Sequence, residues 1–306
     1  FNGWYTAASG GSKVLNADGS FAGAVSGYCT ATAWATTANK TLYAQFSINS
    51  YTITLKAGNG VSTVALSGWT GTGTATMTKS VDYGTVIDLT TITPTFKSGY
   101  SETSWVKTSG SGTLSETTFT VGAGVATLTV NAATLAAPAP SISTTNVTKI
   151  FGASATTLTA TQSTPYDSGV SVSYAFGNST SASGTYTYGS ASTTATSSVG
   201  AESHYGKEYY KVQAYASDGT LTSTTATWSS SMSVTLKAAT ITFDATTNGG
   251  TISDSNPRYA KKDATTLYTT NTGTTGATVP TASKEGYTFN GWYTAASGGT
   301  KALNAD

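Results

Sequence analysis

The stretch FNGWYTAASGGSKVLNAD (residues 1–18) decides how the chain is interpreted, because a nearly identical stretch, FNGWYTAASGGTKALNAD, occupies residues 289–306. The two stretches agree at 16 of 18 positions, and only Ser12 and Val14 of the first differ from their counterparts, which are Thr and Ala. Agreement over this length identifies an internal duplication, here with an offset of 288 residues. We therefore interpret the chain as slightly more than one period of a tandem array.

The composition predicts an all-β protein with minor α-structure. Of the 306 residues, 38% are hydrophobic, which is sufficient for compact cores. Only 9% are charged, whereas typical domains contain about a quarter. Threonine and the 18 tyrosines favour strands, because branched and aromatic side chains pack well on a pleated surface. The 33 glycines supply tight turns. We expect a string of small β-modules.

The chain is nearly neutral, with 15 lysines and arginines against 14 acidic residues and a net charge of +1. No basic stripe is present to neutralise phosphates, so we expect no nucleic-acid partner. No apolar run is long enough to cross a bilayer, so we expect no direct membrane insertion, and signals for export or anchoring are expected outside this segment. The neutral, hydroxyl-rich composition favours an extracellular location, at a cell surface or secreted.

One module becomes visible when the sequence is read as circular, running from residue 238 to 306 and on through residues 1–46. The alternation in ATITF and TLYAQF predicts strands with one buried face. The triplets NGG and SGG indicate turns that need positive φ. The stretch TVPTASKEGY (residues 278–287) has a proline in a short connection, where we expect one helical turn.

Three segments of this module, ITFDATTNGGT (241–251), ATVPTASKEGYTFNGWYTAASGGTK (277–301) and TLYAQF (41–46), resemble the Listeria–Bacteroides repeat, which is similar to the B-repeat of listerial internalins. The paired signatures around GWYT and TLYA occur in order, with a strand before them. The resemblance implies a small β-grasp-like unit, strung in tandem on secreted or wall-attached bacterial surface proteins. An insertion at residues 16–38 departs from the family pattern.

We predict four segments along the chain. Residues 1–46 are the C-terminal part of a Listeria–Bacteroides-type repeat, and residues 238–306 are the N-terminal part of the next. Residues 47–137 are a divergent second β-grasp-like module, because they repeat the first module's order of proline, Gly-Tyr and Trp. Residues 138–237 are an immunoglobulin-like β-sandwich, since short strands recur at sandwich spacing and YYKVQAYASDGTLTS (209–223) is similar to a hairpin of bacterial immunoglobulin-like domains.

We predict no enzymatic activity, with no catalytic residue, cofactor or metal site. The one histidine, His204, lacks neighbouring zinc ligands and is expected at the surface or at a strand end. The one cysteine, Cys29, cannot form an internal disulfide and is expected to be a small half-buried side chain. The acidic residues are scattered singly, without the pairing of a glycosidase site or the repeated oxygens of a calcium loop.

The tryptophans divide between cores and surfaces. One or two buried rings per module contribute several kcal/mol, and we assign Trp105 and Trp292 to cores. Trp34 and Trp69 lie in loops rich in Gly and Thr, and they are the candidates for exposed binding aromatics. The duplicated stretches supply the aromatic side chains expected at the junction between repeats: Phe1, Trp4, Phe289 and Trp292.

These observations predict a non-catalytic structural repeat unit of a long extracellular bacterial stalk, adhesin or filament. Its expected partners are neighbouring copies of the same repeat, joined head to tail. Two alternatives remain open. One is a module that binds glycans or a host surface protein through Trp34 and Trp69, and the other is an accessory region of a secreted enzyme.

Overall fold

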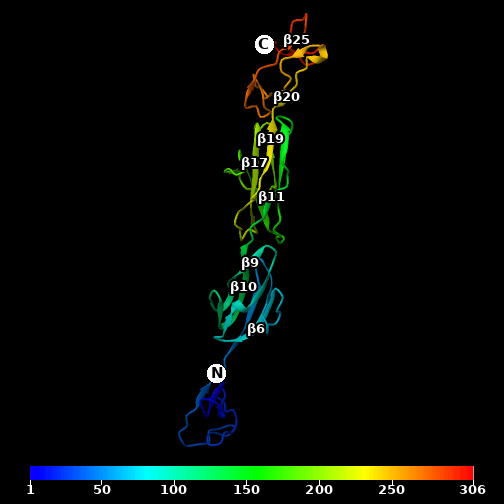
Figure 1. Ribbon diagram of the computed structural model, residues 1–306. Helices are drawn as coiled ribbons and strands as arrows, with labels where there is room; N and C mark the ends of the chain where they lie inside the picture. Colours follow the sequence, from blue (N-terminus) through cyan, green and yellow to red (C-terminus); the bar gives the residue numbers. More distant parts are fainter. Residues whose placement is uncertain (306) are drawn as a thin grey trace. The chain divides into compact units, whose positions relative to one another are not determined.

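A computed structural model describes residues 1–305 and confirms an all-β protein (Figure 1). Among these residues the helical segments are two 3-10 turns, η1 (Leu89–Thr91) and η2 (Thr246–Asn248). The helical turn expected near Pro280 is absent, because Ala282–Ser283 there forms strand β25 and pairs with another strand. The chain divides into two compact units, one of residues 1–97 and 102–133, the other of residues 98–101 and 134–306.

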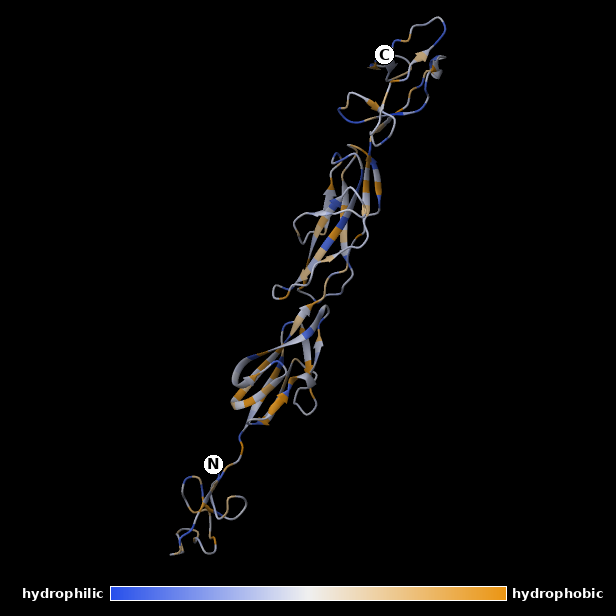
Figure 2. Ribbon diagram, turned by 60° about the vertical axis from the view of Figure 1, so that its left-hand side comes forward, coloured by the Kyte–Doolittle hydropathy of each residue, from blue (hydrophilic) through white to orange (hydrophobic). Residues whose placement is uncertain are grey.

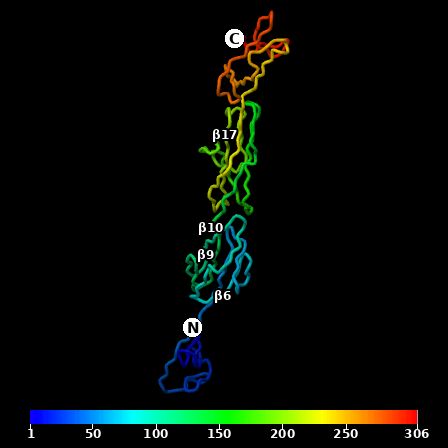
Figure 3. The backbone as a smooth tube through the Cα atoms, in the orientation of Figure 1, coloured from blue at the N-terminus to red at the C-terminus, as the bar shows by residue number. Residues whose placement is uncertain are grey.

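The first unit begins with a small antiparallel sheet. Its strands are β1 (Gly3–Tyr5), β2 (Lys13–Leu15) and β3 (Tyr43–Gln45), in the order β2-β1-β3. Between β2 and β3 the insertion noted in the sequence forms a long loop held by isolated bridges, drawn in blue in Figure 3.

The rest of the first unit is a five-stranded sheet with a two-stranded partner. Strands β6, β4, β10 and β7 lie side by side in that order, and β9 pairs with β10. Strands β5 and β8 form the smaller sheet. The bounds are β4 (Ser50–Ala57), β5 (Val61–Ala65), β6 (Thr76–Asp82), β7 (Val86–Asp88), β8 (Thr93–Phe96), β9 (Tyr100–Leu114) and β10 (Thr118–Leu135).

Alternating burial along these strands produces the core of the first unit. Ile53 and Leu55 of β4 are fully buried, as are Phe119 and Leu128 of β10. Since successive side chains of a strand point to opposite faces, each strand contributes every second residue to the interior. Figure 2 shows hydrophobic and hydrophilic positions alternating along the strands.

In the second unit, residues 140–237 form two sheets that share one core. The first sheet has the order β11-β13-β16, and the second has the order β12-β19-β17-β14-β15 with β18 beside β17. Leu158 from the first sheet and Val212 and Leu236 from the second meet in this core. The bounds are β11 (Pro140–Ile142), β12 (Val147–Ile150), β13 (Thr156–Gln162), β14 (Ser171–Ser179), β15 (Thr187–Tyr188), β16 (Thr196–Val199), β17 (Gly206–Ser217), β18 (Ala226–Thr227) and β19 (Met232–Lys237).

Residues 239–303 of the second unit form three small sheets around a core of their own. The strand orders are β20-β22-β23-β24, β21-β25 and β26-β27. Phe243, Leu267 and Trp292 are the largest buried hydrophobic side chains there. The bounds are β20 (Ala239–Ile241), β21 (Thr251–Ile252), β22 (Arg258–Ala260), β23 (Leu267–Tyr268), β24 (Gly276–Ala277), β25 (Ala282–Ser283), β26 (Trp292–Tyr293) and β27 (Lys301–Leu303).

The Leu128→Ala substitution should destabilise the first unit by about 2–5 kcal/mol, because it empties a fully buried position. Urea unfolding followed by tryptophan fluorescence measures the loss, since Trp69 and Trp105 both contact this core. Val125→Ala is the control on the same strand: Val125 is 64% exposed, so its truncation should change stability by less than about 0.5 kcal/mol. Equal effects of the two substitutions would contradict the assigned core.

Candidate functional site

The duplicated stretches fold into the same hairpin at both places. In the first copy Trp4 pairs with Leu15 and Tyr5 with Lys13, with an irregularity between them. In the second copy the register is the same 288 residues later, from Trp292 to Leu303, with the same irregularity. The 16 shared residues therefore specify the local structure in both settings.

A glycine begins each hairpin for a steric reason. Gly3 has φ +122° and Gly291 has φ +112°, in a region that residues with a side chain rarely adopt. A Cβ atom would overlap the carbonyl oxygen of Leu15 in the first copy and that of Leu303 in the second. The loop is closed in the same way too, since the amide of residue 12 donates to the Thr6 hydroxyl (3.0 Å) and that of residue 300 to the Thr294 hydroxyl (3.0 Å).

The two copies differ in what lies on the other edge of the central strand. In the first copy β3 pairs with β1, and Trp4 faces Ala44. The Gln45 side chain strengthens this pairing, because its Nε2 donates to the carbonyl oxygens of Ala7 (2.9 Å) and Gly10 (2.7 Å). In the second copy, β26 pairs only with β27 among the described residues. The second edge of β26 therefore lacks a strand within residues 1–305.

The tryptophans of the two copies lie in opposite environments. Trp4 is 39% exposed, whereas Trp292 is 9% exposed. The Trp292 ring packs edge-on against Phe243, with centroids 4.8 Å apart, and against Phe289, at 5.2 Å. Its indole Nε1 donates to the carbonyl oxygen of Pro280 (2.8 Å), which satisfies the buried N–H. The same hairpin is thus covered by a core in the second copy and uncovered in the first.

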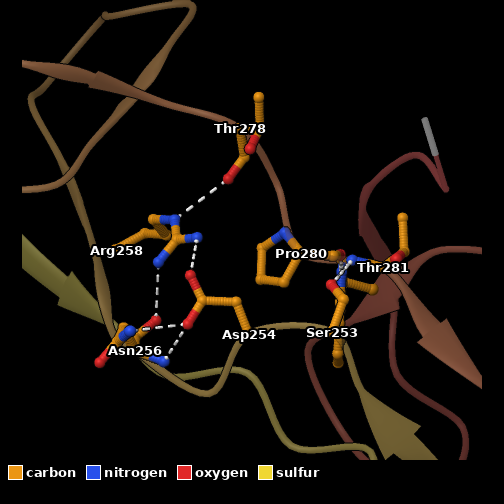
Figure 4. Close-up of polar contacts among 8 residues, drawn as sticks. Ser253, Asp254, Asn256, Arg258, Thr278, Pro280 and Thr281 are labelled. Carbon is orange, nitrogen blue, oxygen red and sulfur yellow. Dashed lines mark hydrogen bonds and ion pairs between the residues drawn. The ribbon is translucent and has the colours of Figure 1, made fainter.

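A buried arginine holds the chain around Pro280 from the other side (Figure 4). The Arg258 guanidinium donates to the carbonyl oxygens of Thr278 and Asn256 and to the carboxylate of Asp254 (2.7 Å). The Arg258 bond is the main cause that lowers the pKa of Asp254 below its ordinary value, together with a bond from the Asn256 backbone. The carboxylate of Asp254 therefore balances the charge of Arg258. The bond to Thr278 also holds the backbone just before Pro280, whose carbonyl oxygen accepts from Trp292.

An open groove of about 1040 Å³ lies beside β26. Its walls combine apolar and backbone surfaces, from Phe243, Tyr287, Phe289 and Trp292 on one hand and the loop at Ala295 and Gly298 on the other. The groove is thus lined by β26, by the loop that follows it and by Ala302 and Leu303 of β27, the strand that pairs with β26.

The repeated hairpin, its aromatic core and this groove lie in one segment that a family comparison recognises. Residues 240–306 match the family model of the Listeria-Bacteroides repeat domain. This confirms the resemblance noted in the sequence for that segment, and such domains occur in bacterial surface proteins. Comparisons with curated proteins and with solved structures find no match to the chain.

Of the two tryptophans expected to be exposed, Trp34 is 43% exposed and packs edge-on against the Tyr28 ring, in the loop before the TLYAQF segment. Trp69 is 7% exposed and belongs to the core of the first unit, so its predicted exposure is wrong. The reason is local pairing: Thr70 exchanges two backbone hydrogen bonds with Thr78, which folds the Gly- and Thr-rich loop back and turns the ring inward.

Two residues assigned small structural roles are more enclosed than expected. The His204 side chain is only 9% exposed and lies two residues before β17, so the strand-end alternative describes it and the surface alternative does not. Its Nε2 lies 3.2 Å from the Val234 carbonyl oxygen, an acceptor, and its Nδ1 lies 2.8 Å from the Ser203 hydroxyl. Cys29 is buried, and its thiol donates to the Gly23 carbonyl oxygen. Both side chains stabilise loops in this way.

Within residues 1–305 no three His, Cys, Asp or Glu side chains come together as a metal site would require. No helix in the same range combines the length and the apolar character needed to cross a membrane.

The Trp292→Ala substitution should destabilise the repeat domain by about 3–5 kcal/mol, the usual effect of emptying a buried tryptophan site. The Trp4→Ala substitution, in the same hairpin sequence, should have well under half that effect because Trp4 is 39% exposed. Native-state hydrogen exchange of the two hairpins gives the local free energies of opening. Similar losses in the two copies would show that the aromatic core around Trp292 contributes little.

The stability of the repeat domain should depend on pH through Asp244. Hydrogen bonds from the Thr247 and Thr246 side chains and backbone lower the pKa of Asp244 to about 2. A carboxylate whose folded pKa is depressed stabilises the fold above its unfolded pKa of 3.8 and loses that effect as the pH falls toward 2.

The urea midpoint of the Trp292 indole N–H resonance, measured by NMR, should thus stay level above pH 4 and fall between pH 4 and pH 2, the window set by those pKa values. Asp244→Asn should weaken this dependence, and the part that remains is expected from Asp254, whose pKa is also lowered. Glu285→Gln, which removes an exposed carboxylate from the same domain, should leave it in place. A fall of the same size in the Asp244→Asn protein would exclude Asp244 as its cause.

Proposed function

We propose that the chain is a non-catalytic structural repeat unit of a bacterial surface stalk, adhesin or filament. The observation that supports this most directly is the duplicated hairpin, in which 16 of 18 residues recur 288 positions apart and fold alike. The second copy lies in a Listeria-Bacteroides repeat domain, a domain of bacterial surface proteins, which fits an extracellular or surface location.

The distribution of cores supports such a role. Separate buried clusters lie within residues 53–130, 142–236 and 243–292. When each segment buries its own apolar side chains, stability is a sum of local contributions, and copies can be added without disturbing those already present. A chain built in this way suits a stalk or filament, which is lengthened by adding further copies of the repeat.

The surface chemistry supports a passive role. With 9% charged residues and a net charge of +1, the chain exerts little long-range electrostatic attraction. Contacts made by neutral hydroxyl groups depend weakly on salt, because there is little charge for ions to screen. A stalk exposed to changing ionic strength would keep its properties.

Mass spectrometry of the protein from its source cells tests the array. Trypsin cleaves after Lys13, Lys40 and Lys301. Residues 14–40 therefore form one peptide, which begins VLNADGSFAGAV and ends at Lys40. In a tandem array a second peptide should exist, in which ALNAD (302–306) continues into GSFAGAV (19–25), since the period places these residues in succession. The Ala in place of Val14 distinguishes the two peptides.

The peptide of residues 14–40 serves as the internal control of the digest. Brief trypsin treatment of intact cells should release both peptides, while a cytoplasmic marker protein stays intact. An ALNAD peptide that continues into unrelated sequence would exclude the array, and release only after lysis would exclude the surface location.

A further inference from the structure

Two lysines of the repeat domain contact the two-sheet segment, which is the part of the chain formed by residues 140–237. The Lys262 Nζ donates to both carboxylate oxygens of Glu202, at 2.8 and 2.9 Å. The Lys262 backbone amide donates to the Tyr205 hydroxyl oxygen, at 2.8 Å. All three residues belong to the same compact unit. The repeat domain is therefore joined to the two sheets by side chains as well as by the covalent chain.

The neighbouring Lys261 contacts one aromatic ring in each segment. Its Nζ lies 5.0 Å from the ring centroid of Tyr205 and 5.0 Å from that of Tyr268. A cation at this distance is attracted to the electron-rich face of an aromatic ring. Tyr205 directly precedes β17 of the two-sheet segment, and Tyr268 lies in β23 of the repeat domain. One ammonium group thus attracts rings from both segments.

Tyr205 and Lys261 are each held by a neighbour in their own segment. The Tyr205 ring stacks on the Phe151 ring, with centroids 4.0 Å apart and planes inclined by 10°. On the other side of the contact, a Cβ atom added to Gly273 would overlap the Lys261 side chain, so this loop lies directly against the lysine. Both partners are therefore positioned for the contact by local packing.

The backbone between the two segments is short and enclosed. β19 ends at Lys237 and β20 begins at Ala239, so a single residue, Ala238, separates them. Ala238 is 1% exposed, and its amide donates to the Asn271 carbonyl oxygen (2.7 Å). The Lys237 carbonyl oxygen accepts from the Phe151 amide (2.9 Å). This backbone lacks the exposed, unpaired character of a flexible linker.

The contacts across the junction differ in weight. The Glu202 and Lys262 side chains are 48% and 55% exposed, and ion pairs of this kind contribute little to stability and are screened by salt. Tyr205 is half-buried, and it combines the stacking, the hydrogen bond and the contact with Lys261. We therefore expect the junction to depend on Tyr205 and Lys261 more than on the ion pair.

We propose that Tyr205 and Lys261 hold the two-sheet segment and the repeat domain together as one rigid body. All the residues of the junction lie between 151 and 273, away from the duplicated hairpins. The inference goes beyond the structural role proposed above, because it holds for a single chain whether or not copies recur. The array is tested on source cells and the junction on purified chain, so either can fail without the other.

Residual dipolar couplings of the purified chain, measured by NMR, test the rigidity. In the unsubstituted protein, one alignment tensor should fit the amides of the two-sheet segment together with those of β20 to β24. The double variant with Tyr205→Ala and Lys261→Gln should need two tensors, because it retains the ion pair and the linker but not the aromatic contact. Separate tensors in the unsubstituted protein would overturn the rigid body. One shared tensor in both proteins would assign the rigidity to the linker and overturn the role of the two side chains.

A double-substitution cycle measures the contact between the two side chains. Tyr205→Leu and Lys261→Gln should each speed hydrogen exchange of the β22 and β23 amides, by about two- to fivefold for loss of the cation–aromatic contact. The double variant should exchange only slightly faster than Tyr205→Leu, since both substitutions remove the same contact. An effect of the double variant equal to the product of the single effects would contradict the contact.

Tyr209→Leu is the matched control for Tyr205→Leu. Lys207 lies over the Tyr209 ring at 4.9 Å, so this is the same kind of contact, but both residues are in β17 of the two-sheet segment. Its loss should leave the exchange of β22 and β23 unchanged, while the β14 amides show that the two sheets remain folded in every variant. If Tyr209→Leu speeds exchange of β22 and β23 as much as Tyr205→Leu does, the proposal is wrong.

Discussion

Pairing on both edges of the short Gly-Trp-Tyr strand is the constraint on which the duplicated segment depends. A strand with one free edge leaves backbone groups without partners and an aromatic ring without a second layer. β1 has two strand neighbours but no core over Trp4, whereas β26 has a core over Trp292 but one neighbour. The two copies of the hairpin therefore differ both in strand pairing and in the burial of the tryptophan.

The core around Trp292 is small, so strand pairing contributes a larger share of the stability in the repeat domain than in the other segments. The first unit and the two sheets of residues 140–237 bury many aliphatic side chains between long strands. The repeat domain buries far fewer, between strands of two or three residues. Short strands supply few backbone hydrogen bonds, so a single added strand changes the balance considerably. Arg258 and Trp292 compensate in part by fixing the Pro280 stretch with hydrogen bonds to its carbonyl groups.

The scarcity of charge has a consistent consequence across the chain. Where a charge is buried, as at Arg258, each of the three guanidinium nitrogens donates to a carbonyl or a carboxylate, because an unmatched buried charge would be strongly destabilising. Exposed carboxylates such as Asp244 and Asp88 bond to neighbouring threonines and close turns. The few charges thus serve local structure, and the hydroxyl groups around them supply most of the polar contacts.

The sequence by itself determined the all-β class and the duplicated hairpin, because strand alternation, glycine turns and repetition are local signals in the residues. It also identified the repeat domain of residues 240–306. It misplaced Trp69, since the burial of that ring depends on the backbone pairing of Thr70 with Thr78, which the composition of the Gly- and Thr-rich loop does not indicate. Only the tertiary structure decided that identical hairpins differ in exposure and pairing, because burial depends on which layers are present around them and not on the hairpin's own residues.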